Sequence, residues 1–485
     1  MEAHRAASRR VALLRSEVEI LVNVDDVVMR EVPAPVKDCP LAPVALSDAT
    51  IAERREKIVA RMRERGIEQL VVYGDVEHGG NFEYLVGFFP RFEEGLLVID
   101  ATGQTSVVLG NENLNKAAKA RVSMERVSHA SLFSLPNQPQ RADKTLGELL
   151  ADAGIRPGVR TGLVGWKMFT SPVEDNARLF DLPHYVVEAV RAVVGDDGLL
   201  ENACDVFVGE HGVRTTMNAN ELAHYEFSAS LASDCMLDAM DALDVGVTEM
   251  ELGDKLVRYG QHTSVVTIAA AGPRFVQANM YPTNRDVREG DTISLTVGYR
   301  GGLSSRAGYA VSSADGLPGS VRDYADRVAK PYFAAYATWL ERIRVGMEGG
   351  ELFETIERVL PRDTFGWTLC PGHLTAEEEW LASPVYEGSS ESLCSGMMLQ
   401  IDIIPSVAGY GGVSAESTVA LADDVLKAQI EQEYPTMWKR VCQRRAYIED
   451  VLGIALSPDV LPMCSTVAYL RPYLLNKRLA CAACL

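Results

Sequence analysis

Asp402 is the residue whose surroundings point most clearly to chemistry. It lies between Ile401 and Ile403 in the apolar run MMLQIDIIP at 397–405. An ionised carboxylate buried in such a run costs several kcal/mol unless it is paired or its pKa shifts. We therefore interpret Asp402 as a residue of a functional site.

His373 and Glu416 are two further candidates, because their side chains exchange protons and bind metal ions. His373 follows Cys-Pro-Gly in a loop, where an isolated histidine is more often structural than catalytic. Glu416 stands just before the strand-like STVAL, where an acidic residue commonly faces solvent. The three glutamates at 377–379 are typical of a solvated loop. Residue type alone therefore does not assign these side chains to a site.

Length and charge exclude several classes of function. The chain has 485 residues, enough for two or three domains, and 47 Lys+Arg against 67 Asp+Glu give a net charge of −20. A surface of this sign repels phosphate backbones and anionic lipid headgroups, so we expect neither nucleic acids nor membranes as partners. No apolar run approaches the roughly 18 residues of a membrane span, and the first residues lack the continuous apolar core of a signal peptide. Nine scattered cysteines without an ordered disulfide framework favour a reducing compartment, and we expect a cytoplasmic protein.

Two groups of predicted helices and strands carry the candidate residues. Residues 1–46 include the proline-rich VPAPVKDCPLAP and predict an extended arm rather than a domain. A helix at 51–67 that stops at Gly66, followed by the strand-like QLVVYG, GLLVID and TSVVLG, predicts an α/β domain ending near Ala192. Beyond it, helices alternate with the strand-like VVTIAAAG, DTISLTVGY, MMLQIDIIP and STVALA, which suggests a duplicated α+β body.

Several short motifs occur in the order found in one known family. They are NMYPTNRDVREGDTISL at 279–295, IRVGM at 343–347, Pro-Gly-His ending at His373, SGMMLQIDIIP at 395–405 and GVSAESTV at 412–419. In these motifs and their spacing the chain resembles the creatinase, prolidase and aminopeptidase P family over about residues 50–425. The resemblance implies an N-terminal ribonuclease-H-like domain followed by a pita-bread catalytic domain, usually in a homodimer.

The fold class expected from this resemblance is α+β, with four parts along the chain. We predict an N-terminal arm at 1–46 and a creatinase-type N-terminal domain at 47–205. A pita-bread catalytic domain follows at 206–430, and a C-terminal extension occupies 431–485. The two-domain division agrees with the one drawn from the pattern of helices and strands.

The resemblance assigns ligands by position, and here the sequence departs from its relatives. Metallopeptidases of the family hold two divalent cations with two Asp, one His and two further acidic residues. Alignment puts Thr296 at the first Asp position, and the second falls within 305–308, which contains no carboxylate. What remains is His373, Asp402 and Glu416, as an acid/base set or as three ligands for one ion. We expect no cofactor, and one divalent ion (Mn, Co, Zn or Fe) on these three residues is the alternative.

The metal-free branch of the family is creatinase, which cleaves a C–N bond in an amidino acid. Phe89-Pro-Arg91 resembles the Phe-x-Arg with which creatinase grips its substrate carboxylate across the dimer, a task suited to a guanidinium fork. Thr283-Asn-Arg285 followed by GDxxSL is a second likeness. Both matches are short, and an ordinary strand edge and turn is the alternative interpretation of Phe89 and Arg91.

Two positions argue against creatine itself as the substrate. Asn279 stands where the catalytic histidine of creatinase should be, and an amide cannot act as a general base. Arg306 falls near the glutamate that holds the amidino group, and like charge would repel a guanidinium substrate. Arg91 and Arg306 together favour a small carboxylated compound. The predicted substrate-binding set is completed by Asn279, Tyr281, Thr296 and Glu379.

Three functions remain open on this basis. The first is a creatinase-like hydrolase or lyase that cleaves a C–N or related bond in a small carboxylated compound, without a dinuclear metal centre. The second is a metallopeptidase that acts on Xaa-Pro peptides with one divalent ion on His373, Asp402 and Glu416. The third is a pita-bread protein that binds a partner and performs no chemistry.

Overall fold

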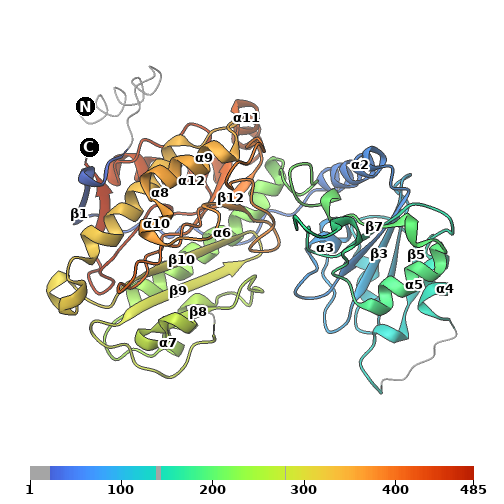
Figure 1. Ribbon diagram of the computed structural model, residues 1–485, viewed down its shortest axis with the longest axis horizontal. Helices are drawn as coiled ribbons and strands as arrows, with labels where there is room; N and C mark the ends of the chain where they lie inside the picture. Colours follow the sequence, from blue (N-terminus) through green and yellow to red (C-terminus); the bar gives the residue numbers. More distant parts are fainter. Residues whose placement is uncertain (1–21, 138–143, 279, 485) are drawn as a thin grey trace. The chain divides into compact units, whose positions relative to one another are not determined.

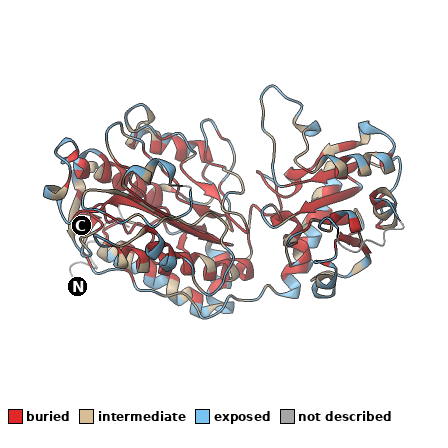
Figure 2. Cartoon of the chain, turned by 90° about the horizontal axis from the view of Figure 1, so that it is seen from below, coloured by how far each residue is buried: buried red, intermediate tan, exposed pale blue. Residues whose placement is uncertain are grey.

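The chain divides into two units, one formed by Leu46–Thr215 and the other by the segments on either side of it. The computed structural model describes residues 22–137, 144–278 and 280–484 (Figure 1). In each unit the buried residues follow the strands and the helix faces that cover them (Figure 2). The division falls at 215/216, beyond the predicted 205/206, because the intervening segment is bonded to the first unit. There Tyr84 Oη donates to the Val213 carbonyl over 3.0 Å and Arg214 donates to Asn81 over 2.7 Å.

A six-stranded mixed sheet, in the order β5-β4-β3-β2-β6-β7, is the centre of the first unit. Helix α2 begins at Ser47, whose hydroxyl accepts a hydrogen bond from the Thr50 amide, and it ends at Gly66 with φ +65°, as predicted. The strands of this unit are β2 (Gln69–Gly74), β3 (Gly95–Asp100), β4 (Thr105–Leu109), β5 (Met124–His129), β6 (Thr161–Val164) and β7 (Leu200–Asn202), and its helices are α2 (Asp48–Arg65), α3 (Gly80–Val86), α4 (Leu146–Asp152) and α5 (His184–Val194).

Two further sheets, in the orders β10-β9-β8 and β11-β12-β13-β14, form the core of the second unit, and a third consists of β1 and β15. The strands are β1 (Val27–Glu31), β8 (Ile268–Ala271), β9 (Thr292–Tyr299), β10 (Gly302–Tyr309), β11 (His373–Leu374), β12 (Met398–Gln400), β13 (Thr418–Leu421), β14 (Val460–Pro462) and β15 (Leu479–Ala483). The helices are α6 (Ala219–Ala242), α7 (Glu249–Leu256), α8 (Lys330–Arg342), α9 (Gly349–Val359), α10 (Arg362–Phe365), α11 (Asp424–Glu433) and α12 (Pro435–Ala446). Helix α6 packs against β9 and β10, and α8 packs against α9.

The two larger sheets of this unit meet where β10 runs beside the segment that precedes β13. The Ser305 amide donates to the Glu416 carbonyl over 3.2 Å, and the Ala307 amide donates to the Ser414 carbonyl over 3.4 Å. All strand pairs within the two sheets are antiparallel. This contact places the residues around Glu416 next to the middle of β10.

The N-terminal arm lies along helix α6 and runs antiparallel to it. The Asp38 and Cys39 amides each donate to the Asp234 carboxylate over 3.2 Å. Further contacts between arm and helix follow at one-turn and two-turn intervals: Lys37 with Asp238, Cys39 Sγ with the Phe227 carbonyl, the Val44 carbonyl with His224 Nδ1 and the Ala45 carbonyl with Asn220. The predicted arm is therefore a strap held along the helix by both backbone and side-chain bonds.

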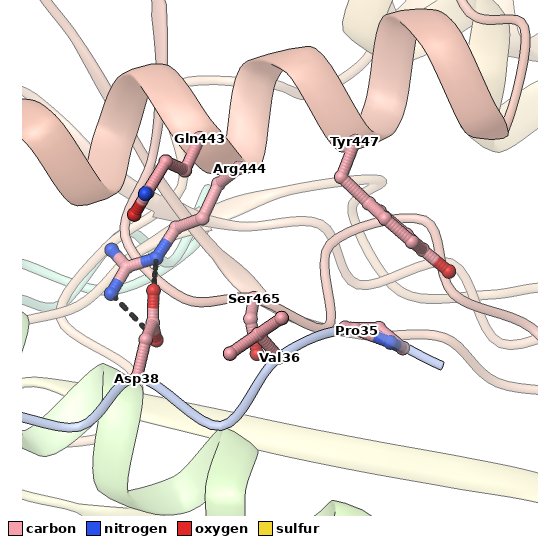
Figure 3. A pocket seen from close by; sticks show the side chains of 7 residues that line it. All are labelled: Pro35, Val36, Asp38, Gln443, Arg444, Tyr447 and Ser465. Carbon is pink, nitrogen blue, oxygen red and sulfur yellow. Dashed lines mark hydrogen bonds and ion pairs between the residues drawn. The ribbon is translucent and has the colours of Figure 1, made fainter. Parts of the chain in front are cut away.

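A buried ion pair fastens the arm to helix α12. Arg444 donates to the two oxygens of Asp38 over 2.7 and 2.9 Å and is also paired with Glu226 of α6 at 2.8 Å. A cavity of about 240 Å³ remains between the arm and this helix (Figure 3). It is lined by Pro35, Val36, Asp38, Gln443, Arg444, Tyr447 and Ser465.

The residues of the predicted C-terminal extension pack within the second unit. Strand β14 adds to the sheet beside β13, and β15 pairs with β1, with Val27 opposite Ala483. Residues 431–485 are thus part of the unit that carries the candidate site. In the described parts of the chain, no helix is both long enough and apolar enough to span a membrane.

Candidate active site

Three side chains from neighbouring strand ends meet inside the second unit. His373 opens β11, Asp402 lies two residues after β12, and Glu416 lies two residues before β13. In the register of the sheet His373 stands opposite Gln400, and Gln400 stands opposite Thr418. Because side chains alternate between the faces of a sheet, this register brings the three candidates to one face. All three are buried, with His373 fully enclosed.

The turn that delivers His373 depends on Gly372. Its φ of +148° is rarely adopted by residues with side chains, and a Cβ there would lie 3.3 Å from Trp339 Nε1. The same indole donates a 2.7 Å hydrogen bond to the Pro371 carbonyl. The Pro-Gly-His motif therefore lets the backbone pass close to Trp339 and turn the imidazole into the core.

The polar atoms of the three side chains converge but are not bonded to one another. His373 Nε2 lies 3.9 Å from Asp402 Oδ2 and 3.8 Å from Glu416 Oε1, and one ligand atom from each residue lies within 4.8 Å of the others. Among the described residues, His373 Nε2, Asp402 Oδ1 and Glu416 Oε1 find no hydrogen-bond partner. Buried polar atoms are normally paired, so an unpaired polar atom on each of these three neighbouring side chains indicates that the cluster can hold a cation.

The donor set fits one divalent ion. Imidazole nitrogen and carboxylate oxygen bind such ions at about 2.0–2.2 Å, so two ligands of one ion are at most about 4.4 Å apart. The two distances from His373 Nε2, 3.8 and 3.9 Å, satisfy this limit, and the 4.8 Å within which all three ligand atoms lie exceeds it by a few tenths of an ångström. His373 Nδ1 lies 3.2 Å from the Leu374 carbonyl, a contact that assigns the proton to Nδ1 and leaves the Nε2 lone pair for an ion. In the part of the chain that the structure describes, no second group of His, Cys, Asp and Glu is arranged in this way.

Burial controls the protonation of the cluster. Loss of water raises the pKa values of the Asp402 and Glu416 carboxyls well above their usual range, and the nearby Glu416 raises that of Asp402 further. Burial also lowers the pKa of His373, an effect that the Asp402 carboxylate opposes. The imidazole is therefore neutral, as a metal ligand must be.

A short hairpin brings Glu379 and Trp380 next to this cluster. The Trp380 ring stacks on the His373 imidazole with centroids 4.0 Å apart and planes inclined by 20°. Burial raises the pKa of the Glu379 carboxyl, while attraction to His373 lowers it. Glu379 was predicted as a substrate-binding residue, and its carboxylate also acts electrostatically on Asp402 and Glu416. Trp380 was not predicted, because its stack on His373 depends on a hairpin that the sequence pattern does not reveal.

Thr296 lies where the resemblance expects the first carboxylate ligand, and Ser305 belongs to the segment 305–308 in which it expects the second. Thr296 stands opposite Ser305 in the β9–β10 register, and Thr296 Oγ1 donates to Ser305 Oγ over 2.8 Å. Ser305 adjoins Glu416 through its backbone amide. These side chains are neutral and satisfy each other, so they add no negative charge beside the three candidate ligands.

Arg306 points away from these hydroxyls, which corrects its prediction as a substrate-binding residue. Nε donates to the Tyr469 carbonyl, Nη1 to the carbonyls of Ser305 and Glu416, and Nη2 to the Thr466 carbonyl and the Ser417 hydroxyl. All five donors of the buried guanidinium are thereby used, and none remains for a substrate carboxylate. The arginine still contributes a fixed positive charge that lowers the pKa of Glu416.

The remaining predicted site residues do not join this cluster. Phe89 and Arg91 belong to the first unit, where the exposed Arg91 guanidinium lies 5.4 Å from the ring centre of Phe92. Tyr281 is exposed on a loop of the second unit. Asn279 lies outside the described residues.

Gln400 is a further residue of the site that the sequence did not single out. It is buried, stands opposite His373 in the sheet, and its Nε2 finds no partner in the described residues. Its Oε1 accepts a 3.2 Å hydrogen bond from the Thr418 hydroxyl. The signal available in the sequence was its position two residues before Asp402, which places both on one face of an extended segment.

Comparison with known proteins assigns a family to this region. Residues 223–423, which include all three cluster residues, match the model of metallopeptidase family M24. This part of the chain is similar to the M24 metallopeptidases. At the level of curated protein sequences, no match is found.

Solved structures with the M24 fold cover both units. A Xaa-Pro dipeptidase from Bacillus anthracis matches 77% of this chain and 94% of its own with 18% identity and a TM-score of 0.57. The prolidase from Pyrococcus horikoshii OT3 matches 76% and 95% with 17% identity and a TM-score of 0.58. A single-residue variant of aminopeptidase P from Escherichia coli matches 78% and 93% with 16% identity and a TM-score of 0.54. The predicted fold, an N-terminal domain followed by a pita-bread domain, is confirmed.

The expectation that the protein needs no cofactor is wrong. The family whose model matches is a family of metallopeptidases, and the cluster retains three ligand atoms suited to a divalent ion. The absence of two of the family's aspartates does not decide the question, because a sequence pattern does not reveal that the surviving ligands converge at one buried point.

Proposed function

We propose that the protein is an M24 hydrolase that binds one divalent metal ion through His373, Asp402 and Glu416. The observation that carries the proposal is the convergence of three buried ligand atoms that have no partner among the described residues. The solved relatives include a Xaa-Pro dipeptidase, a prolidase and an aminopeptidase P. We therefore take the reaction to be hydrolysis of an amide C–N bond in a small peptide-like compound.

Charge balance supports a single ion. Asp402, Glu416 and Glu379 supply three negative charges when ionised, and Arg306 supplies one positive charge behind Glu416. One divalent ion brings the buried group to neutrality, whereas a second would leave two uncompensated positive charges. Uncompensated charge in the protein interior is strongly unfavourable. The neutral pair of Thr296 and Ser305 adds no ligand for a second ion.

The chain's own residues supply the rest of the proposed chemistry. A divalent ion at this position lowers the pKa of water and polarises a carbonyl oxygen. Glu379, half-buried and with a raised pKa, is placed to accept a proton from water and to pass it to the departing nitrogen. His373, with its proton on Nδ1, serves as a ligand and takes no part in proton transfer. Burial of all three ligands limits the access of bulk water.

Metal analysis of the purified chain is the first test. We expect about one equivalent of Mn, Co or Zn per chain. The variant His373→Ala should lose the bound metal, and it should also lose the ability to hydrolyse a panel of Xaa-Pro dipeptides and carboxylated amides. Removal of the ion by a chelator should abolish turnover, and its return should restore it. Wild-type protein that binds no stoichiometric ion when each metal is supplied would contradict the proposal.

A carboxylate on the substrate is a finer part of the proposal, and the family resemblance assigns its binding to Arg91 of a second copy of the chain. The exposed Arg91→Ala substitution should raise KM for carboxylated amides without changing kcat or the bound metal. Equal KM values for wild type and variant would remove the carboxylate requirement. The homodimer implied by the resemblance stays a prediction, which light scattering on the full chain checks directly.

A protein that keeps the fold and binds a partner without chemistry is the second candidate. The observation in its favour is the Thr296–Ser305 hydrogen bond, which satisfies both hydroxyls where the family resemblance expects carboxylate ligands. If this candidate is correct, wild type and His373→Ala show the same background turnover with every substrate tested. Metal-dependent hydrolysis by wild type alone excludes it.

A further inference from the structure

The hairpin that carries Trp380 is closed by backbone hydrogen bonds on both sides of the indole. The Leu374 amide donates to the Ala382 carbonyl over 2.7 Å, and the Leu381 amide donates to the Leu374 carbonyl over 2.9 Å. At the tip, the Ala376 amide donates to the Glu378 carbonyl over 3.1 Å. Trp380 and His373 each adjoin a residue of this pairing, and their two rings stack on each other.

The stack places a large, partly exposed ring over a fully buried one. The ring centres of Trp380 and His373 are 4.0 Å apart with a 20° inclination, and the indole is 40% exposed whereas the imidazole is 0% exposed. Trp380 stacks one face of its indole on a candidate metal ligand. Because much of the remaining ring surface is exposed, burial of that surface contributes little to stability. Its position is therefore explained better by what it does to the imidazole than by core packing.

The imidazole needs such a support because its hydrogen bonds leave its plane free. The χ2 torsion of histidine has broad minima, and in the described structure Nε2 has no partner that would hold it. The contact of Nδ1 with the Leu374 carbonyl, at 3.2 Å, distinguishes the two flipped orientations of the ring but does not fix its tilt. The flat face of Trp380 fixes that tilt.

We propose that Trp380 is a positioning residue for His373, holding the imidazole plane so that Nε2 faces Asp402 and Glu416 and thereby strengthening metal binding. This inference rests on the proposed metal site. The electron-rich indole face favours the stack further when a cation on Nε2 draws electron density from the imidazole, in the manner of a cation–π contact. Trp380 touches neither substrate nor reacting atoms in this role.

The chain contains a matched stack away from the cluster. In the first unit Trp166 stacks on His78 with centroids 4.8 Å apart and an inclination of 23°, and it is 43% exposed. His78 Nδ1 lies 3.4 Å from Asp75 Oδ1 rather than among several carboxylates. Substitution of Trp166 therefore serves as the matched control. It removes an indole of similar exposure that stacks on a histidine at a similar inclination, and it leaves the candidate metal ligands unchanged.

The experiment measures Mn²⁺ and Co²⁺ binding to the full chain by calorimetry and tryptophan emission. Trp380→Leu should weaken binding by about 10–100-fold, the range found for residues that support metal ligands, while Trp380→Phe retains affinity within about threefold. Bound Co²⁺ should quench an emission component that wild type and Trp166→Leu possess and Trp380→Phe lacks. Circular dichroism and the melting temperature of each apo variant confirm that folding is unchanged.

Three results would separate the possibilities. Equal affinity of wild type and Trp380→Leu would overturn the positioning role while leaving the metal site intact. Equal weakening by Trp166→Leu would overturn it too, because the effect would then belong to loss of any surface indole. Absence of ion binding by wild type would overturn the proposed function and the role of Trp380 with it.

Discussion

Thr296 and Ser305 face each other across β9 and β10, and the Thr296 hydroxyl donates a 2.8 Å hydrogen bond to the Ser305 hydroxyl. The next residue, Arg306, turns its guanidinium to the opposite side of β10, where backbone carbonyls take up its donors. One strand thus carries a neutral hydroxyl on one face and a positive charge on the other, and both residues donate to the Glu416 carbonyl, Ser305 through its backbone amide and Arg306 through its guanidinium. This arrangement is the structural reason for proposing one ion instead of two.

The hydroxyl pair should be coupled energetically and independent of metal binding. Thr296→Val and Ser305→Ala should each destabilise the protein by about 1 kcal/mol, and the double variant should lose little more than either one. Urea unfolding of the four proteins measures the coupling. Metal content should stay at the wild-type level in all of them, and fully additive losses would show that the hydrogen bond contributes nothing.

Arg306→Met should be strongly destabilising, by about 3–5 kcal/mol, because it removes a buried charge and leaves several carbonyls without donors. Thermal unfolding monitored by circular dichroism checks this. The exposed Arg322→Met is the matched control, for which a change within about 0.5 kcal/mol is expected. A similar small change at both positions would contradict the structural role given to Arg306.

The arm should loosen when its buried ion pair is broken. Asp38→Ala removes the bidentate partner of Arg444 and should cost about 1–3 kcal/mol. Limited proteolysis should then cut within residues 32–45 faster than in wild type. Lys37→Ala, which breaks only the more exposed pair with Asp238, should change stability by less than about 1 kcal/mol. Equal protection of the arm in both variants would show that Asp38 does not anchor it.

Stability should depend on pH through Asp234. Burial raises the pKa of this carboxyl to about 6, above the ordinary value of 3.8 that it regains on unfolding. Between these two pKa values the folded state binds more protons than the unfolded state. The contribution of Asp234 to the free energy of unfolding is therefore largest below about pH 4 and decreases as the pH rises to about 6. Asp234→Asn should flatten that part of the curve of unfolding free energy against pH. An unchanged slope in the variant would mean that another group titrates there.

The sequence was sufficient for residues whose type conflicts with their surroundings. Asp402 could be identified because a carboxylate in an apolar run demands a partner, and the structure places its carboxylate beside His373. The orientation of the Arg306 side chain could not be inferred. The sequence of a strand does not indicate whether the donors of a charged side chain face a ligand or backbone carbonyls. Trp380 was not predicted, because its stack on His373 depends on the hairpin at 374–382 rather than on a periodic pattern.

Local elements followed from the sequence more readily than long-range pairings. The apolar runs around β9, β12 and β13 and the Gly66 helix stop are visible in the pattern of residues. Strand β12 ends at Gln400, however, so Asp402 lies beyond it in irregular backbone where the apolar run had suggested continued strand. Pairing of β1 with β15 joins segments more than 400 residues apart, and no local signal reveals it.

That last pairing has a consequence for how the protein is made. Strand β1 leaves the ribosome well before Arg444 of α12 and before its partner β15, which follows it by more than 400 residues. The intervening Leu46–Thr215 has its own sheet and core and can fold first, as domains generally do during translation. The arm meanwhile lacks these partners, so completion of the second unit, and with it the buried site, depends on the synthesis of β15.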